Sequence, residues 1–157
     1  MNKGYIMYTA YGFFINQKEM ADKCPTAILA GASEIKDHRL VFRGGNAEAL
    51  ATIEPHKGGT VPVLLWEITP ADEAALDSFH GTHYRKEQIK VRLDGRTVSA
   101  MLYIMEADGQ PLAQPSAYYY ATIRGGYTDA GFDEKIIRQS LADSVGPEDI
   151  AVNEEGK

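Results

Sequence analysis

Three short stretches of the sequence combine residue types that could bind or transform a small molecule. The first, residues 11–16, reads Tyr-Gly-Phe-Phe-Ile-Asn and follows a run that is typical of a β-strand. A glycine at the end of a strand lets the backbone turn sharply, which leaves amide N–H groups free to hold a carbonyl or carboxylate. The same residues also fit a plain strand-ending turn with its aromatic side chains in the core. The pattern therefore predicts either the edge of a ligand pocket, with Tyr11 and Gly12 at its rim, or an ordinary turn.

The second stretch, residues 76–84, places His80 directly before Gly81 at the expected end of a helix. A histidine there interacts favourably with the negative end of the helix dipole, which gives it a purely structural role. It could equally act as a general base, because the pKa of imidazole lies near neutrality. A metal site shared with His83 is disfavoured, since a glycine cap separates the two and no Cys or Glu completes a ligand set. We expect no metal site.

The third stretch, residues 116–127, contains three consecutive tyrosines, Tyr118 to Tyr120, within an expected helix. Successive residues of a helix are turned by about 100 degrees, so the three rings cannot all face the core. At least one hydroxyl should face a cavity or solvent. A half-buried aromatic belt without a ligand is the alternative interpretation.

The elements that must position these stretches are mostly strands. The segment 60–68 is apolar on both faces, which predicts a central, buried strand. Thr69 and Pro70 form a good helix start, and Asp94-Gly95 is a hairpin signal. About seven short strands with short helices predict an α+β fold with a mixed, mostly antiparallel sheet curled into a small barrel. The expected strands cover residues 4–11, 27–35, 38–42, 49–53, 60–68, 88–93 and 97–105, and the expected helices cover residues 17–23, 69–81, 116–124 and 133–142.

Composition narrows the setting. A chain of 157 residues suits one domain, which we place at residues 1–144, followed by a flexible acidic tail at 145–157. A formal net charge of −6 without a basic stripe argues against nucleic acid or an anionic membrane as partner. The single cysteine, Cys24, and the lack of a long apolar run favour a cytoplasmic protein. No glycine-rich phosphate-binding motif occurs, so no cofactor is expected. The oligomeric state is left open.

Taken together and in this order, the segments resemble the gamma-glutamylcyclotransferase-like family, which has the AIG2-like fold. The resemblance covers about residues 5–142, and no single motif carries it. It implies a small mixed barrel with a ligand at one end, held by the backbone amides of the Tyr-Gly turn. The matching segments are residues 10–16 (AYGFFIN), 36–44 (KDHRLVFRG), 51–55 (ATIEP), 61–69 (VPVLLWEIT), 76–77 (LD), 101–105 (MLYIM), 119–124 (YYATIR) and 131–132 (GF).

The resemblance also implies a reaction and a set of site residues. In family members that cyclise, the α-amino group of a γ-glutamyl unit attacks its own side-chain carbonyl and releases an amine and 5-oxoproline. A Glu before the helix-end glycine transfers the proton, and a tyrosine of the late helix lines the cavity. The residues expected to bind the ligand here are Tyr11, Gly12, Phe13, Phe14, Ile15, Tyr84, Tyr119 and Tyr120, with His80 as the candidate catalytic residue.

This sequence departs from the family pattern where the chemistry lies. His80 stands at the position of the catalytic Glu, and Phe13 and Phe14 replace the Ser and Asn of the turn. One hypothesis is therefore an altered protein that binds or sequesters a planar, aromatic or nucleotide-like small molecule without turnover. The alternative is an active cyclotransferase with His80 as the base, in which Asp77 or Glu87 supplies the missing negative charge. A protein-binding role for the acidic tail is a third, weaker interpretation.

Overall fold

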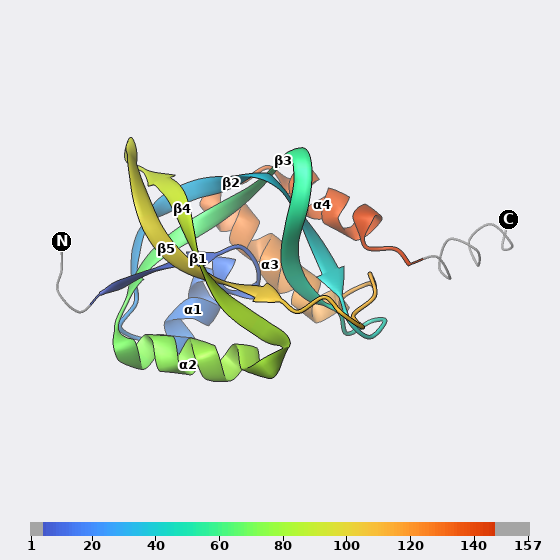
Figure 1. Ribbon diagram of the computed structural model, residues 1–157, viewed down its shortest axis with the longest axis horizontal. Helices are drawn as coiled ribbons and strands as arrows, with labels where there is room; N and C mark the ends of the chain where they lie inside the picture. The colour runs from blue at the N-terminus through green and yellow to red at the C-terminus, as the bar shows by residue number, and fades with distance from the viewer. Residues whose placement is uncertain (1–4, 147–157) are drawn as a thin grey trace, which may run out of the picture.

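Two long strands that pair with each other along most of their length form the frame of the molecule (Figure 1). The structure, a computed structural model, describes residues 5–146. These residues form one five-stranded sheet and four α-helices. The strands are β1 (Ile6–Ala10), β2 (Ile28–Arg43), β3 (Leu50–Ile68), β4 (Tyr84–Leu93) and β5 (Arg96–Met105). The helices are α1 (Gln17–Lys23), α2 (Pro70–His80), α3 (Ala117–Ala130) and α4 (Glu134–Asp143), with short 3-10 turns η1 (Phe13–Ile15) and η2 (Gly81–His83).

The order of the strands in the sheet is β2-β3-β1-β5-β4. All neighbours are antiparallel except β1 and β5, which run parallel, with Tyr8 opposite Met101. This places β1 at the centre of the sheet, flanked by β3 and β5. Because β1 is short, the chain leaves it at Tyr11 between two longer hairpins, one formed by β2 and β3 and the other by β4 and β5.

The sequence predicts separate strands where β2 and β3 are in fact continuous. The sequence predicts that the strands end near Asp37 and Gly58. In the structure both strands continue, and the ladder contains a bulge there, where the register shifts between Lys36 and His38. The Asp37 carboxylate accepts a hydrogen bond from the N–H of Gly58 at 3.0 Å, so the irregular residues of the two strands satisfy each other. Pairing between the strands thus overrides the local turn signals.

The predicted α+β class and the mixed, mostly antiparallel sheet are confirmed, but the sheet is not closed into a barrel. The edge strands β2 and β4 approach each other without pairing in the part of the chain that the structure describes. Leu93, at the end of β4, packs against β2 at this junction. Its Cδ1 atom lies 2.8 Å from the position that a Cβ on Gly31 would occupy.

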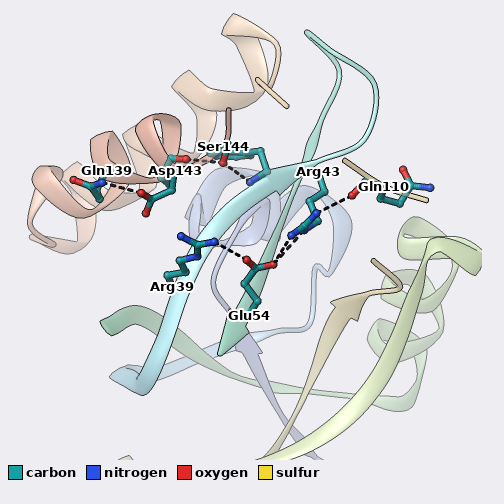
Figure 2. A network of polar contacts seen from close by, with 9 residues as sticks. Arg39, Arg43, Glu54, Gln110, Gln139, Asp143 and Ser144 are labelled. Atoms are coloured by element: carbon teal, nitrogen blue, oxygen red, sulfur yellow. Dashed lines mark hydrogen bonds and ion pairs between the residues drawn. The ribbon is translucent and has the colours of Figure 1, made fainter. Parts of the chain in front are cut away.

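A polar network joins β2 to β3 (Figure 2). The Glu54 carboxylate accepts hydrogen bonds from Arg39 at 2.9 Å and from Arg43 at 3.0 Å. Arg43 also donates to the backbone carbonyl of Gln110 at 2.9 Å. Ser144, at the end of α4, accepts the N–H of Phe42 at 2.8 Å, which holds that helix against β2. These contacts fix the segment of β3 that leads to the site.

The helices begin as their sequences predict. Thr69 and Asp72 form a capping box at the start of α2, and Pro70 occupies its first turn. Helix α3 differs from the prediction, because it continues through Gly125 and Gly126 to Ala130 instead of ending before them. The reason is packing, since a Cβ on Gly126 would lie 2.4 Å from the Ile15 side chain and 2.7 Å from the Asn16 nitrogen.

The core lies between the sheet and the helices, with Phe14, Phe42 and Tyr127 among its largest fully buried side chains. None of the helices within residues 5–146 is long and apolar enough to cross a membrane. The acidic tail predicted from residue 145 lies outside the described residues from position 147 onward.

The two adjacent glycines of α3 give a matched test of this packing. Gly126→Ala is expected to lower the free energy of unfolding by about 3 kcal/mol, because backbone atoms of the 15–16 turn leave no room for a methyl group. Gly125→Ala should raise it by up to about 1 kcal/mol, since its nearest neighbour lies 3.6 Å away and alanine is the better helix former. Urea unfolding of both variants measures the difference. Equal effects on the free energy of unfolding would contradict the close packing of Gly126 against the 15–16 turn.

Candidate functional site

A cavity of about 170 Å³ lies at the end of β1, where the chain turns into η1. Most of its walls are aromatic. It opens between the turn, the C-terminal end of α2, the start of β4 and the first turn of α3. The lining residues are Tyr8, Tyr11, Gly12, Phe13, Phe14, Leu50, Ala51, Phe79, His80, His83, Tyr84, Tyr103 and Tyr119.

Gly12 allows the turn to pass close to β3. A Cβ at this position would lie 3.1 Å from the Cβ of Ala51, which is tighter than ordinary van der Waals contact. The turn is closed by a hydrogen bond from the N–H of Ile15 to the carbonyl of Gly12 at 3.0 Å. Asn16 then caps α1 and donates from its amide to the Thr122 carbonyl at 3.0 Å. The turn is therefore held by β3 on one side and by α3 on the other.

The phenylalanines of the turn form an apolar wall. The ring of Phe13 stacks on Phe79, with centroids 5.7 Å apart, and on Tyr119, with centroids 5.6 Å apart. Phe14 is buried and meets Phe79 edge to face at 4.8 Å. These offset-stacked and edge-to-face geometries are favourable for aromatic pairs. The turn thus supplies flat carbon surface to the cavity.

His80 is held in one orientation by stacking and by a hydrogen bond. Its ring lies parallel to Tyr103, with centroids 3.8 Å apart and planes at 5°. Its Nδ1 lies 2.7 Å from the Leu76 carbonyl, which can only accept, so Nδ1 carries the proton and Nε2 is left with a lone pair. Burial lowers the pKa of His80 to about 4, although the Leu76 carbonyl and the charge of Asp77 oppose the shift. The imidazole is therefore neutral at neutral pH.

Tyrosine hydroxyls join the walls to one another. Tyr84 donates to the carbonyl of Ala51 at 2.6 Å, and Tyr119 accepts the N–H of the same residue at 3.1 Å. Tyr11 donates to the carbonyl of Tyr103 at 2.5 Å. Burial raises the pKa of Tyr119 to about 12 and that of Tyr11 further, so both phenols stay neutral and neither is a base at neutral pH.

The two carboxylates considered as a source of charge lie outside the cavity. Asp77 accepts the hydroxyl of Tyr103 at 2.5 Å and pairs with Lys86 at 3.0 Å. Burial opposes ionisation of Asp77, but these two hydrogen bonds outweigh it and hold the pKa of its carboxyl below the usual value. Glu87 pairs with Arg85 on β4. Neither carboxylate lines the cavity.

Nine residues were singled out from the sequence, and seven of them line this cavity. The two exceptions are Ile15 and Tyr120. Ile15 is fully buried beneath α3. Tyr120 is half-buried and lies near Phe42. The predicted residues that line the cavity are Tyr11, Gly12, Phe13, Phe14, His80, Tyr84 and Tyr119.

Sequence reasoning missed six lining residues. Phe79 lines the cavity with a side chain that is 45% exposed. Its position directly before the candidate residue His80 could have indicated that it lies near the cavity. Tyr8 and Tyr103 meet because β1 and β5 pair in parallel, and no local pattern indicates that pairing. The missed residues are Tyr8, Leu50, Ala51, Phe79, His83 and Tyr103.

Within residues 5–146, no group of three or more His, Cys, Asp or Glu side chains is placed to hold a metal ion. His83 lines the cavity together with His80, but no third ligand joins them in the described part of the chain.

Comparison with known proteins identifies the family. A family model described as gamma-glutamyl cyclotransferase, AIG2-like, matches residues 8–121, which is most of the chain. The chain belongs to this family. No curated protein matches the sequence.

Solved structures share the fold at low sequence identity. A human protein described as uncharacterized protein loc79017 superposes with a TM-score of 0.77 at 21% identity, covering 88% of this chain and 87% of that one. A structure described as gamma-glutamyl cyclotransferase gives 0.77 at 22% identity, covering 87% and 86%. YkqA from Bacillus subtilis gives 0.67 at 19% identity, covering 87% of this chain and 53% of that one.

Protonation of His80 is expected to destabilise the fold. The folded protein holds the pKa of His80 at about 4, whereas an unfolded histidine titrates near about 6.5. The unfolded chain therefore binds more protons between these values, and stability falls as the pH is lowered through that window. The expected loss is up to about 3 kcal/mol, measured by urea unfolding at a series of pH values.

His80→Gln is the matched control, because it keeps a polar side chain of similar reach that does not titrate. Its stability should fall less steeply than that of the wild type over the same window. Parallel curves for the two proteins would show that His80 is not the titrating group.

Proposed function

We propose that this protein binds a small molecule through a planar or aromatic group and does not cyclise γ-glutamyl compounds. Cyclisation needs a base that takes a proton from the α-ammonium group, a negative charge that attracts this ammonium, and donors for the oxyanion. The geometry at His80 is the observation that carries the proposal.

His80 does not offer the charge. Burial holds the pKa of His80 at about 4, so the imidazole is neutral at neutral pH. A carboxylate of similar pKa would be no stronger as a base, but it would be an anion. A glutamate at this position would at least pair with the ammonium as an anion, which a neutral imidazole cannot do. The nearby carboxylate of Asp77 is already bound to Tyr103 and Lys86.

The size and surface of the cavity support a flat guest. A cavity of about 150 Å³ lined by apolar side chains is large enough for benzene, and this one is about 170 Å³. It accommodates one ring, so the rest of a larger ligand, such as the sugar of a nucleoside, would lie outside the mouth. A lining in which eight side chains are Phe or Tyr suits a planar group.

Two measurements on the purified protein test this proposal. Mass spectrometry of the protein isolated under mild conditions is expected to find a co-purifying molecule that contains a planar ring. An assay with γ-glutamyl amino acids and γ-glutamyl amines is expected to release no 5-oxoproline above the rate in buffer. A family member that carries Glu at the position of His80 serves as the positive control.

The alternative of an active cyclotransferase is favoured by one observation, the lone pair that the hydrogen bond to Leu76 leaves on Nε2 of His80. Release of 5-oxoproline that is lost in His80→Ala would establish this alternative and overturn the proposal. Release that persists in His80→Ala would overturn both, because the base would then be another group.

A further inference from the structure

One hydroxyl of the cavity wall has no partner in the protein. Tyr8 on β1 lines the cavity and is only 4% exposed, and its phenol oxygen makes no hydrogen bond to any of residues 5–146. Burial raises the pKa of this phenol well above its usual value, so the hydroxyl keeps its proton at neutral pH. A buried hydroxyl without a partner destabilises a fold unless a ligand or a solvent molecule satisfies it.

Tyr127 provides an internal comparison for this hydroxyl. The phenol oxygen of Tyr127 also has no partner in the described part of the chain, but it is completely enclosed by the core. The oxygen of Tyr8 is not enclosed in this way, and Tyr8 lines the cavity together with Tyr11 and Tyr119. The free proton of Tyr8 is therefore available to a ligand, whereas that of Tyr127 is not.

The cavity also has a second free proton and, on another wall, a fixed acceptor. The hydroxyl of Tyr119 accepts the N–H of Ala51, and within the described residues its own proton has no acceptor. Nε2 of His80 has only a lone pair, because Nδ1 holds the ring proton against the Leu76 carbonyl. The donors thus come from β1 and α3, and the acceptor comes from the end of α2. A matching ligand needs its own acceptor and its own donor on different atoms.

A charged ligand does not match this set. Among residues 5–146, no Lys, Arg, Asp or Glu lines the cavity, so an ion would lose its hydration without an opposite charge in exchange. The ammonium of Lys23, which lies on the Phe79 ring at the mouth, would in addition repel a cation. The ligand is therefore neutral. An amide is the neutral group that combines an N–H donor and a carbonyl acceptor in one plane.

From these contacts we infer that the ligand carries a neutral cyclic amide, a flat ring with an N–H group beside a carbonyl, and that the Tyr8 hydroxyl helps to select it. The carbonyl would accept the free protons of Tyr8 and Tyr119, and the N–H would be donated to Nε2 of His80. The inference rests on the proposed function, because it assumes that the cavity binds a planar molecule. It adds the polar pattern of that molecule's ring.

Three neutral probes of one ring each separate these patterns. 2-Pyridone has an N–H beside its carbonyl, 1-methyl-2-pyridone keeps only the carbonyl, and phenol has its donor and acceptor on a single atom. Calorimetric titration of the full-length protein at neutral pH is expected to give a dissociation constant for 2-pyridone about tenfold below those of the other two, the scale of one hydrogen bond. Equal affinity for all three would overturn the inference and leave the proposed function intact, because a flat ring would still bind. No binding of 2-pyridone would also overturn the inference, whereas release of 5-oxoproline bears on the proposed function alone.

Two variants isolate the contribution of the Tyr8 hydroxyl. Tyr8→Phe keeps the ring and removes a hydroxyl that has no protein partner, so the affinity for 2-pyridone should fall about fivefold without loss of stability. Tyr127→Phe removes the enclosed hydroxyl and should leave the affinity unchanged. Calorimetric titration and urea unfolding of both variants measure these effects. An unchanged affinity in Tyr8→Phe, or an equal loss in both variants, would overturn the role of Tyr8 in selecting the ligand.

Discussion

The architecture of the site depends on how closely the turn after β1 is enclosed by its neighbours. Gly12 faces Ala51 on β3, and Gly126 of α3 lies against Ile15 and the Asn16 backbone. At both contacts a methyl group would meet atoms at less than ordinary van der Waals distance. Because the turn cannot move toward either neighbour, the rings of Phe13 and Phe14 have fixed positions, and the remaining walls are placed relative to them.

The electrostatics of the site follow from this rigid apolar frame. A charged imidazole in such surroundings would lose its hydration, so burial keeps His80 neutral despite the carboxylate of Asp77 nearby. Asp77 in turn stays ionised because Tyr103 and Lys86 donate to it. The negative charge therefore lies behind the stacked pair of Tyr103 and His80 and not inside the cavity. Members of the family share the fold, whereas the position of these charges determines which groups the cavity of this chain can bind.

Much of this arrangement could be predicted from the sequence, where local signals were strong. The capping residues of α2, the hairpin at Asp94-Gly95 and the turn at Gly12 are short-range patterns with a direct physical cause. The continuity of β2 and β3 was not predictable in this way, because the pairing partner of each irregular residue lies in the other strand. Gly126 was read as a helix breaker because its packing partner, Ile15, is distant in sequence. Tyr103 was missed for the same reason, since its neighbours come from β1 and α2.

The open side of the sheet gives the fold a freedom that a closed barrel lacks. Leu93 separates β4 from Gly31 on β2, and its side chain belongs to the buried core. Within residues 5–146, these edge strands meet through side-chain packing and not through backbone hydrogen bonds, whose fixed length would otherwise set their spacing. A larger or smaller residue at this one position can change the curvature of the sheet while every strand pair keeps its ladder. Relatives with the same topology can in this way differ in the width of the space that their sheets enclose.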